Sequence, residues 1–218
     1  VAVAAAAAAA AAASPTDWDY FLFAVRWPPA VAKVPVPSNV TTFAVHGLWP
    51  TRWDGSWPQF CTHERFDERA VQSIAKRLEV EWPDLMYGGN GSSLWKHEWS
   101  KHGTCAVDGS SSTVRDQFSY FNIALKALDN ANIESVFRRN DMTPGGTYPL
   151  SKFQTAAAAA FGHESVLVTC TNFKGKQTLM RLSACFDKNM DKAIDCKNTG
   201  AGHNCHDGGD IWWPRVHE

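Results

Sequence analysis

Two runs of aromatic and β-branched residues near the start of the chain predict strands. The first, at residues 18–27 (WDYFLFAVRW), has few polar positions and ends at a Pro-Pro pair, which is typical of a buried strand. The second, at residues 41–49 (TTFAVHGLW), alternates in polarity. Because successive side chains of a strand point to opposite faces, Val45 is expected on one face and His46 and Leu48 on the other. His46 is therefore expected to project from a strand near its end.

Apolar residues in the middle of the chain recur at steps of three and four, which is the spacing of amphipathic helices. Four helices are predicted, and they cover residues 66–78, 94–104, 114–128 and 151–162. Ser92 or Ser93 is expected to cap the second helix, and Gly103 is expected to close it. Ser151 is expected to cap the fourth.

Two more strands are predicted near the C-terminal end, at residues 165–171 and 178–186. A turn that contains Lys and Gly joins them, so they are expected to pair antiparallel. Strands at both ends and helices in the middle indicate an α+β fold. Because no repeat, linker or shift of charge marks a boundary, residues 17–218 are predicted to form a single domain after an alanine-rich N-terminal segment at residues 1–16.

The composition is that of an ordinary globular protein, and it excludes several classes. Of the 218 residues, 44% are hydrophobic and 20% are charged, which excludes a disordered, collagenous or coiled-coil chain. The formal net charge is −1, so the protein has no overall positive field that would draw it along a nucleic acid. Any polyanion that it handles must therefore be bound at a local site.

The cysteines indicate an oxidising compartment. The six are widely spaced and contain no CxxC pair of the zinc or redox kind, so they predict disulfides. Asn39 and Asn90 begin Asn-X-Ser/Thr sequons, and glycan acceptors in loops are typical of secreted chains. Six reduced thiols in a cytosolic protein are the alternative, but secretion, to an extracellular, vacuolar or lysosomal location, is favoured. The alanine run is too short and too weakly apolar for a membrane span, so no membrane partner is expected.

Three of the eight histidines lie in two segments rich in aromatic residues: FAVHGLWP, which contains His46, and LWKHEWSKHGTC, which contains His97 and His102. Positions four apart share a face of an α-helix, so His97 is expected to lie above Lys101. Glu98 is expected above His102 by the same rule. Zinc is disfavoured, because metal-binding histidines on a helix are typically four apart, as in HExxH, whereas these are five apart.

Two histidines with a carboxylate, an ammonium group and no metal suit phosphoryl transfer within RNA, where the ribose 2′-hydroxyl is a built-in nucleophile. One imidazole can remove its proton, a second can protonate the departing 5′-oxygen, and a cation can stabilise the charge that builds on the phosphoryl group. Imidazole titrates near neutral pH, so the two rings can hold opposite protonation states. The alternative is that the histidines are ordinary core or surface groups, but three in two such segments favour a catalytic role.

HGLWP at residues 46–50 and HEWSKHGTC at residues 97–105 resemble the two signature boxes of the ribonuclease T2 family, the secreted acid ribonucleases of fungi, plants and animals. The resemblance runs from Trp18 to the C-terminal cysteines. It implies a central antiparallel sheet with helices packed mainly on one side, stabilised by disulfides. It also implies an endoribonuclease that cleaves single-stranded RNA to 2′,3′-cyclic phosphates and then to 3′-phosphates. Broad base tolerance, an acid-leaning pH optimum and no metal or other cofactor are expected.

The resemblance also implies a role for each residue of the two boxes. His102 resembles the general base at the 2′-hydroxyl, and His46 resembles the general acid at the leaving 5′-oxygen. His97 resembles the phosphate-binding histidine, while Glu98 and Lys101 resemble the pair that stabilises the pentacoordinate transition state. The implied enzyme is a monomer with RNA as its partner and no obligate protein partner.

Trp49 and Trp57 are candidates to stack a base of the RNA, because aromatic stacking tolerates any base; ordinary core packing is the alternative. The resemblance implies three disulfides, which are Cys61–Cys105, Cys170–Cys205 and Cys185–Cys196. The first would join the helix after the first box to the end of the second. No role is assigned to the remaining histidines, which are His63, His163, His203, His206 and His217.

The chain departs from the family pattern at three places. Ala32 stands where a cysteine commonly follows the first WP, Thr51 where Asp or Asn often follows HGLWP, and Leu94 where Phe is frequent before the Trp of the second box. These departures leave the base preference open. A storage or defence glycoprotein without activity, or a self-incompatibility ribonuclease, is the alternative function, but the catalytic positions of the family pattern are all retained.

Overall fold

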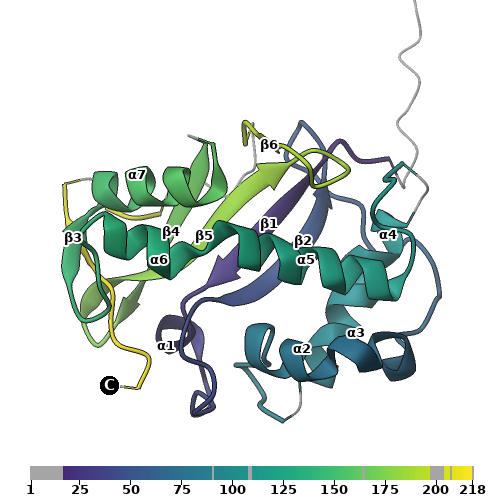
Figure 1. The fold of residues 1–218 in the computed structure, drawn as a ribbon, viewed down its shortest axis with the longest axis horizontal. Helices are drawn as coiled ribbons and strands as arrows, with labels where there is room; N and C mark the ends of the chain where they lie inside the picture. Colours follow the sequence, from purple (N-terminus) through teal and green to yellow (C-terminus); the bar gives the residue numbers. More distant parts are fainter. Residues whose placement is uncertain are drawn as a thin grey trace, which may run out of the picture.

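The computed structural model describes residues 17–89, 91–107, 110–163, 165–196, 204–206 and 208–217. A seven-stranded sheet lies at the centre of this part of the chain, which forms a single α+β domain (Figure 1). The strands are β1 (Tyr20–Arg26), β2 (Ala44–Thr51), β3 (Thr147–Pro149), β4 (Val166–Phe173), β5 (Lys176–Phe186), β6 (Ala193–Ile194) and β7 (Asp210–Trp212). The helices are α1 (Pro28–Val31), the 3₁₀ helix η1 (Glu68–Ile74), α2 (Ala75–Glu81), α3 (Ser92–Glu98), the π-helix η2 (Trp99–Gly103), α4 (Thr104–Ala106), α5 (Gln117–Ala131), α6 (Ile133–Arg139) and α7 (Leu150–Phe161). The alanine-rich segment and the sequon at Asn90 lie outside the described residues.

Strand β5 holds the sheet together. The strand order is β2-β1-β5-β7-β3, and β4 and β6 also pair with β5. Every described strand pair is antiparallel except β5 with β7, which run parallel and meet at Thr178 and Trp212. Because β5 pairs with both β1 and β4, strands from the two ends of the sequence lie in one sheet.

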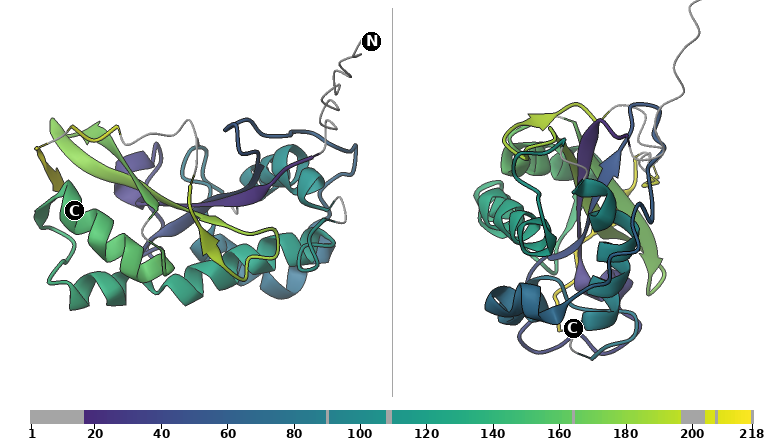
Figure 2. Two further views of the ribbon diagram at one scale, coloured as in Figure 1. Left: turned by 90° about the horizontal axis from the view of Figure 1, so that it is seen from above. Right: turned by 90° about the vertical axis from the view of Figure 1, so that its right-hand side faces the viewer.

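One face of the sheet packs against the helices and forms the main core. Alternate side chains of β1, those of Phe21, Phe23 and Val25, enter this core. Helices α5, α6 and α7 run along the same face (Figures 1 and 2). Phe23 meets Phe161 of α7 edge-on, with ring centroids 6.3 Å apart. The helices therefore lie mainly on one side of the sheet, as expected.

The opposite face of the sheet, called the outer face below, carries a second and smaller apolar cluster that includes Leu22. Trp49 lies opposite Leu22 in the register of β1 and β2, so it points to the same face. Arg26 follows Leu22 by four residues on β1, and Arg181 of β5 is its direct cross-strand partner. The outer face therefore brings Trp49 of the first box onto the same side of the sheet as two arginines.

The predicted helices differ from the observed ones mainly at their ends. Helix α5 begins only after Asp116, whose carboxylate accepts a hydrogen bond from the Ser119 backbone N–H in a capping box, so Val114 lies outside the helix. Helix α7 begins at Leu150, so Ser151 does not cap it. The predicted helix at residues 66–78 is a 3₁₀ helix followed by a short α-helix. The short elements α1, α6, β3, β6 and β7 contain too few residues for a periodic pattern.

Candidate active site

A bulge in β2 positions His46. Ala24 of β1 pairs with Gly47, and the next residue, Val25, pairs with Val45, so His46 is an extra residue on β2. The bulge shifts the alternation of the strand by one residue, and Leu48 therefore lies in the main core with Val45. The expectation that Leu48 shares a face with His46 was wrong for this reason.

The second box adopts a helix that widens in its middle. His97 and Glu98 end α3, whereas Lys101 and His102 lie in η2. The backbone N–H of Thr104 donates to the carbonyl of Trp99, five residues earlier, which is the pattern of a π-helix. A uniform α-helix, in which residues four apart share a face, was therefore the wrong expectation here. A turn closed at five residues brings positions five apart, such as 97 and 102, closer to one face.

Gly103 lies inside this π-helix and does not close the helix as predicted. A Cβ atom at Gly103 would overlap the ring of Trp99, which is fully buried. The glycine thus lets Trp99 pack against its own helix beside the two catalytic candidates of η2. The N-cap of α3 is Gly91, so Ser92 begins the helix and Ser93 follows within it.

Trp49 connects the two boxes. Its indole Nε1 donates a hydrogen bond of 3.0 Å to Oε2 of Glu98. Its ring contacts two histidine rings, with centroids 5.1 Å from His46 and 5.7 Å from His102. The structure therefore brings residues from β2, α3 and η2 together around one tryptophan.

The carboxyl group of Glu98 is almost completely buried, with 4% of the residue exposed. Burial raises the pKa of Glu98 to about 7, and the Trp49 hydrogen bond and the nearby charges of Arg26 and Lys101 oppose this rise. A carboxyl group with such a pKa is largely protonated at mildly acidic pH. It can then donate a hydrogen bond to a phosphoryl oxygen without bringing a second negative charge to the site.

The imidazoles of His46 and His102 favour the neutral form in the free protein. Burial lowers the pKa of His46, and the positive charges of Arg26 and Arg181 lower it further. Burial and the charge of Lys101 lower the pKa of His102. A neutral imidazole can accept a proton, and an imidazolium with a depressed pKa is a strong acid, so the two rings have the properties of a base and an acid.

His97 completes the group at its exposed edge. Burial and the nearby charge of Lys101 lower its pKa, and its charge in turn lowers the pKa values of His46 and His102. The charge of His97 thus acts on both other rings, and the charge of His46 acts on His102, so the three imidazoles lie within electrostatic range of one another. A phosphate group among them would favour the protonated rings and offset the desolvation cost.

The structure also shows the surroundings of three other residues singled out in the sequence. Trp57 has 51% of its surface exposed, which excludes the core-packing alternative for this residue. Thr51 is buried and donates its hydroxyl to the carbonyl of Trp49, so it supports the backbone of the first box. Asn39 lies exposed in a turn, where its side chain is accessible.

Arg26, Arg181 and Gly47 belong to the site but were missed in the sequence. The arginines come from strands far apart in the sequence, and only the pairing of β1 with β5 places them together near His46. Gly47 is part of the first box. A glycine is needed here because a Cβ atom at this position would overlap the Trp49 indole.

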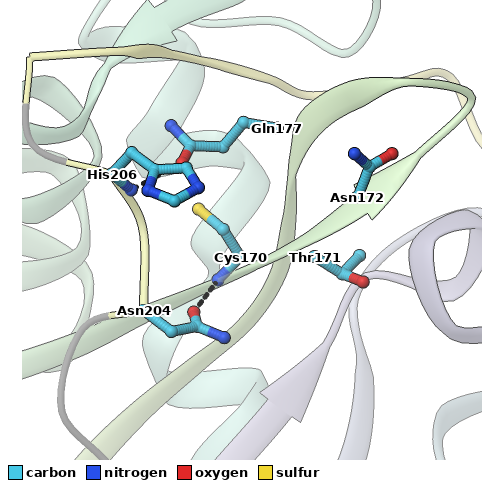
Figure 3. Close-up of a pocket in the computed structure, with 6 residues that line it drawn as sticks. All are labelled: Cys170, Thr171, Asn172, Gln177, Asn204 and His206. Carbon is cyan, nitrogen blue, oxygen red and sulfur yellow. Dashed lines mark hydrogen bonds between the residues drawn. The ribbon is translucent and has the colours of Figure 1, made fainter.

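A separate polar pocket of about 300 Å³ lies beside the Cys170 end of β4 (Figure 3). It is lined by Cys170, Thr171, Asn172, Gln177, Asn204 and His206, and contains none of the five catalytic candidates. Among the residues that the structure describes, no group of three or more His, Cys, Asp or Glu side chains is arranged to hold a metal ion. In the same residues we find no helix with the length and hydrophobicity that a membrane span requires.

Three disulfides have the pairing that the resemblance implied, which is Cys61–Cys105, Cys170–Cys205 and Cys185–Cys196. Cys61 lies in the loop before η1 and not on a helix, and Cys105 lies on α4 directly after η2. The bond closes a separation of 44 residues along the chain. It therefore links the loop that follows the first box to the end of the second.

We expect loss of the Cys61–Cys105 bond to weaken RNA cleavage, because it frees the end of the helix that carries His102. Replacing both cysteines by serine should lower the free energy of unfolding by about 2–4 kcal/mol. Thermal unfolding and cleavage assays of this double variant, compared with a Cys170→Ser/Cys205→Ser control away from η2, test the expectation. Full activity of the first variant would contradict it.

Comparison with known proteins finds relatives that match most of this chain. The model of the Ribonuclease T2 family matches residues 18–196. Ribonuclease Oy from Magallana gigas is 30% identical over 220 residues, which cover 93% of this chain and 99% of the relative. Extracellular ribonuclease LE from Solanum lycopersicum is 29% identical over 190 residues, which cover 83% of this chain and 81% of the relative.

A solved structure agrees with the fold as well. The crystal structure of RNase NT in complex with 5′-AMP is similar to this chain with a TM-score of 0.79 and 28% sequence identity, and the match covers 91% of this chain and 99% of the other. Since the family model matches most of the sequence and the relatives match at nearly full length, this chain belongs to the ribonuclease T2 family.

Proposed function

We propose that this RNA-cleaving enzyme acts by attack of the ribose 2′-hydroxyl on the adjacent phosphate, with His46, His97, Glu98, Lys101 and His102 as its catalytic residues. One observation carries the proposal: Trp49 donates a hydrogen bond to Glu98 and contacts the rings of both His46 and His102. Two imidazoles that contact the same ring lie close enough to act on one phosphate. This is the arrangement that proton removal and proton donation require.

In the first step, His102 removes the proton of the 2′-hydroxyl, whose oxygen attacks phosphorus. The bond from phosphorus to the 5′-oxygen breaks, and His46 gives its proton to that oxygen. Lys101 and Glu98 stabilise the charge on the pentacoordinate phosphoryl group, and His97 binds one of its oxygens. The products are a 2′,3′-cyclic phosphate and a free 5′-hydroxyl.

In the second step, water replaces the 5′-oxygen and opens the cyclic phosphate to a 3′-phosphate. His46 then acts as the base and His102 as the acid, because the step is the reverse of the first with water as the nucleophile. No proton or electron is gained or lost by the enzyme over the cycle. The proposed reaction has no step that needs a metal ion.

We also propose that activity is highest at mildly acidic pH. Burial lowers the pKa of the proposed acid His46, so a lower pH is needed to keep its imidazole protonated before it gives its proton to the leaving oxygen. Glu98, with a pKa of about 7, loses its proton over the same range. Both changes reduce the fraction of enzyme in the proposed active protonation state above neutral pH.

Broad base tolerance is proposed because stacking supplies the base contact. Trp57 is exposed and Trp49 is half-buried, and aromatic faces stack on any base. Neither residue presents a hydrogen-bonding group with a distinct pattern for one base. The hydroxyl of Thr51 is engaged by the Trp49 carbonyl, which removes one possible contact for base recognition.

An extracellular, vacuolar or lysosomal location is proposed on separate grounds. All six cysteines form disulfides, which persist in oxidising compartments. The exposed sequon at Asn39 is accessible to glycosylation. The five proposed catalytic residues come from one chain, so a monomer with RNA as its partner is sufficient for the reaction.

The test is incubation of the protein with RNA in EDTA at about pH 5 and about pH 7.5, which bracket the ordinary pKa of imidazole. Mass spectrometry of the new ends should find cyclic phosphates first and 3′-phosphates later, with faster cleavage at the lower pH. Products with 5′-phosphate ends, or loss of cleavage in EDTA, would contradict the mechanism. Absence of any cleavage by folded protein would favour the alternative of a non-catalytic storage or defence glycoprotein.

A further inference from the structure

Two arginines lie side by side on the outer face, close to His46. Arg26 of β1 and Arg181 of β5 are direct cross-strand partners, and Thr169 of β4 continues the same row. Both arginines act on the charge of His46, so the pair lies within electrostatic range of that imidazole. The mechanism described above uses neither arginine.

Several polar atoms in and beside this row are buried and have no hydrogen-bond partner among the described residues. They are Nε of Arg26, Nε of Arg181, Oγ1 of Thr169 and Oγ of Ser183. Ser183 follows Arg181 by two residues on β5, so its hydroxyl lies on the same face. Of the residues in this group, Arg26, Thr169 and Ser183 are at most 4% exposed, and buried polar atoms without partners are costly in a folded protein.

The positive charge of the pair is only partly balanced. The guanidinium of Arg26 donates to the carbonyl of Pro83 at 2.6 Å and lies near the carboxyl groups of Glu98 and Asp84. Arg181 makes no ion pair with any carboxylate of the described residues. Like charges on directly opposite strand positions destabilise a sheet, so an anion bound between the two arginines would stabilise it.

We propose that Arg181, with Arg26 beside it, binds the RNA phosphate that follows the leaving nucleoside on its 3′ side. The inference rests on the proposed function, in which His46 protonates the leaving 5′-oxygen. The nucleoside on that side of the scissile phosphate is the leaving one, and its next phosphate is the first anion beyond His46 in that direction. Arginine suits this role, because its planar guanidinium can bind two phosphate oxygens at once.

Three short substrates test this proposal, all with the same two nucleosides joined by one scissile phosphate. The first has no other phosphate, the second has an added 3′-terminal phosphate, and the third has an added 5′-terminal phosphate. In the wild-type protein, the 3′-phosphate should raise kcat/KM about tenfold through a charge-assisted contact, and the 5′-phosphate should have a smaller effect. The Arg181→Gln variant should reduce the tenfold ratio to about one.

Two further variants make the test specific. Arg181→Lys keeps the charge but loses the planar guanidinium, so the ratio of kcat/KM with and without the 3′-phosphate should fall between one and ten. Arg139→Gln removes an exposed arginine from α6, which packs on the other face of the sheet, and should keep the full ratio. Because each ratio compares two substrates on one protein, a change in folded fraction or in basal activity cancels.

The outcomes distinguish a failure of the proposed phosphate site from a failure of the proposed function. Cleavage of the first substrate with equal rates for all three would overturn the phosphate site and leave the proposed function intact. A larger effect of the 5′-phosphate, or an equal loss of the ratio in Arg139→Gln, would also overturn it. If no substrate is cleaved by folded wild-type protein, the proposed function itself fails.

Discussion

Replacing His46 or His102 by phenylalanine is expected to lower RNA cleavage by about 100- to 10,000-fold, which is the usual contribution of one general acid or base. Phenylalanine keeps a flat ring beside Trp49 but cannot carry a proton. Burial lowers the pKa of both histidines, so the folded protein favours a neutral ring at each position. The uncharged phenylalanine ring should therefore leave the protein folded. Initial rates on RNA, with circular dichroism as the check of folding, measure the effect.

A matched control is available elsewhere in the chain. His206 is exposed and lines the pocket beside Cys170, so the His206→Phe variant should keep its activity. The losses of activity caused by the two substitutions should not be additive in a double variant, because the acid and the base act together in one step. Substantial turnover by either single variant would remove that histidine from the acid–base pair.

The two roles can be told apart with an activated substrate. A nucleoside 3′-phosphate ester of nitrophenol has a leaving group that departs without protonation, so it needs the base but not the acid. His46→Phe should therefore recover most of its activity on this ester, whereas His102→Phe should remain inactive. The reverse pattern would exchange the two assignments.

The sequence supplied the candidate residues of the site but not their geometry. The two boxes gave all five catalytic candidates, since those residues lie in two short and dense segments. The bulge at His46 and the π-helix at residues 99–103 were not predicted, because each departs from a regular period by one residue. Both irregularities lie where the functional side chains meet, which is where local rules are often broken.

The two arginines near His46 were not predicted because the pairing of distant strands brings them together. Arg26 is the next-to-last residue of a run that reads as a buried strand, and Arg181 lies inside another such run. Each would be interpreted alone as an isolated charge in an apolar segment. Only the antiparallel register of β1 and β5 makes them neighbours, and register is set by contacts across the whole sheet.

Gly47→Ala is expected to lower kcat about 100-fold, although the change adds one methyl group and touches no proposed catalytic histidine directly. The new Cβ atom would overlap the Trp49 indole and would lie 2.7 Å from Oε2 of Glu98. Trp49 would then have to move, and Glu98 would lose the only hydrogen bond described for its buried carboxyl group. An unpartnered group of this kind lowers the free energy of unfolding by about 1–3 kcal/mol.

The control for this variant is Gly209→Ala, where the nearest atom to an added Cβ is Nε2 of Gln177 at 3.3 Å, which a small shift can relieve. A double-mutant cycle with Trp49→Phe tests the cause, because the smaller ring leaves room for the methyl group. If the clash with Trp49 is responsible, Gly47→Ala should cost much less activity in the Trp49→Phe background than in the wild type. Equal losses in both backgrounds would mean that Gly47 acts through the backbone of the bulge and not through Trp49.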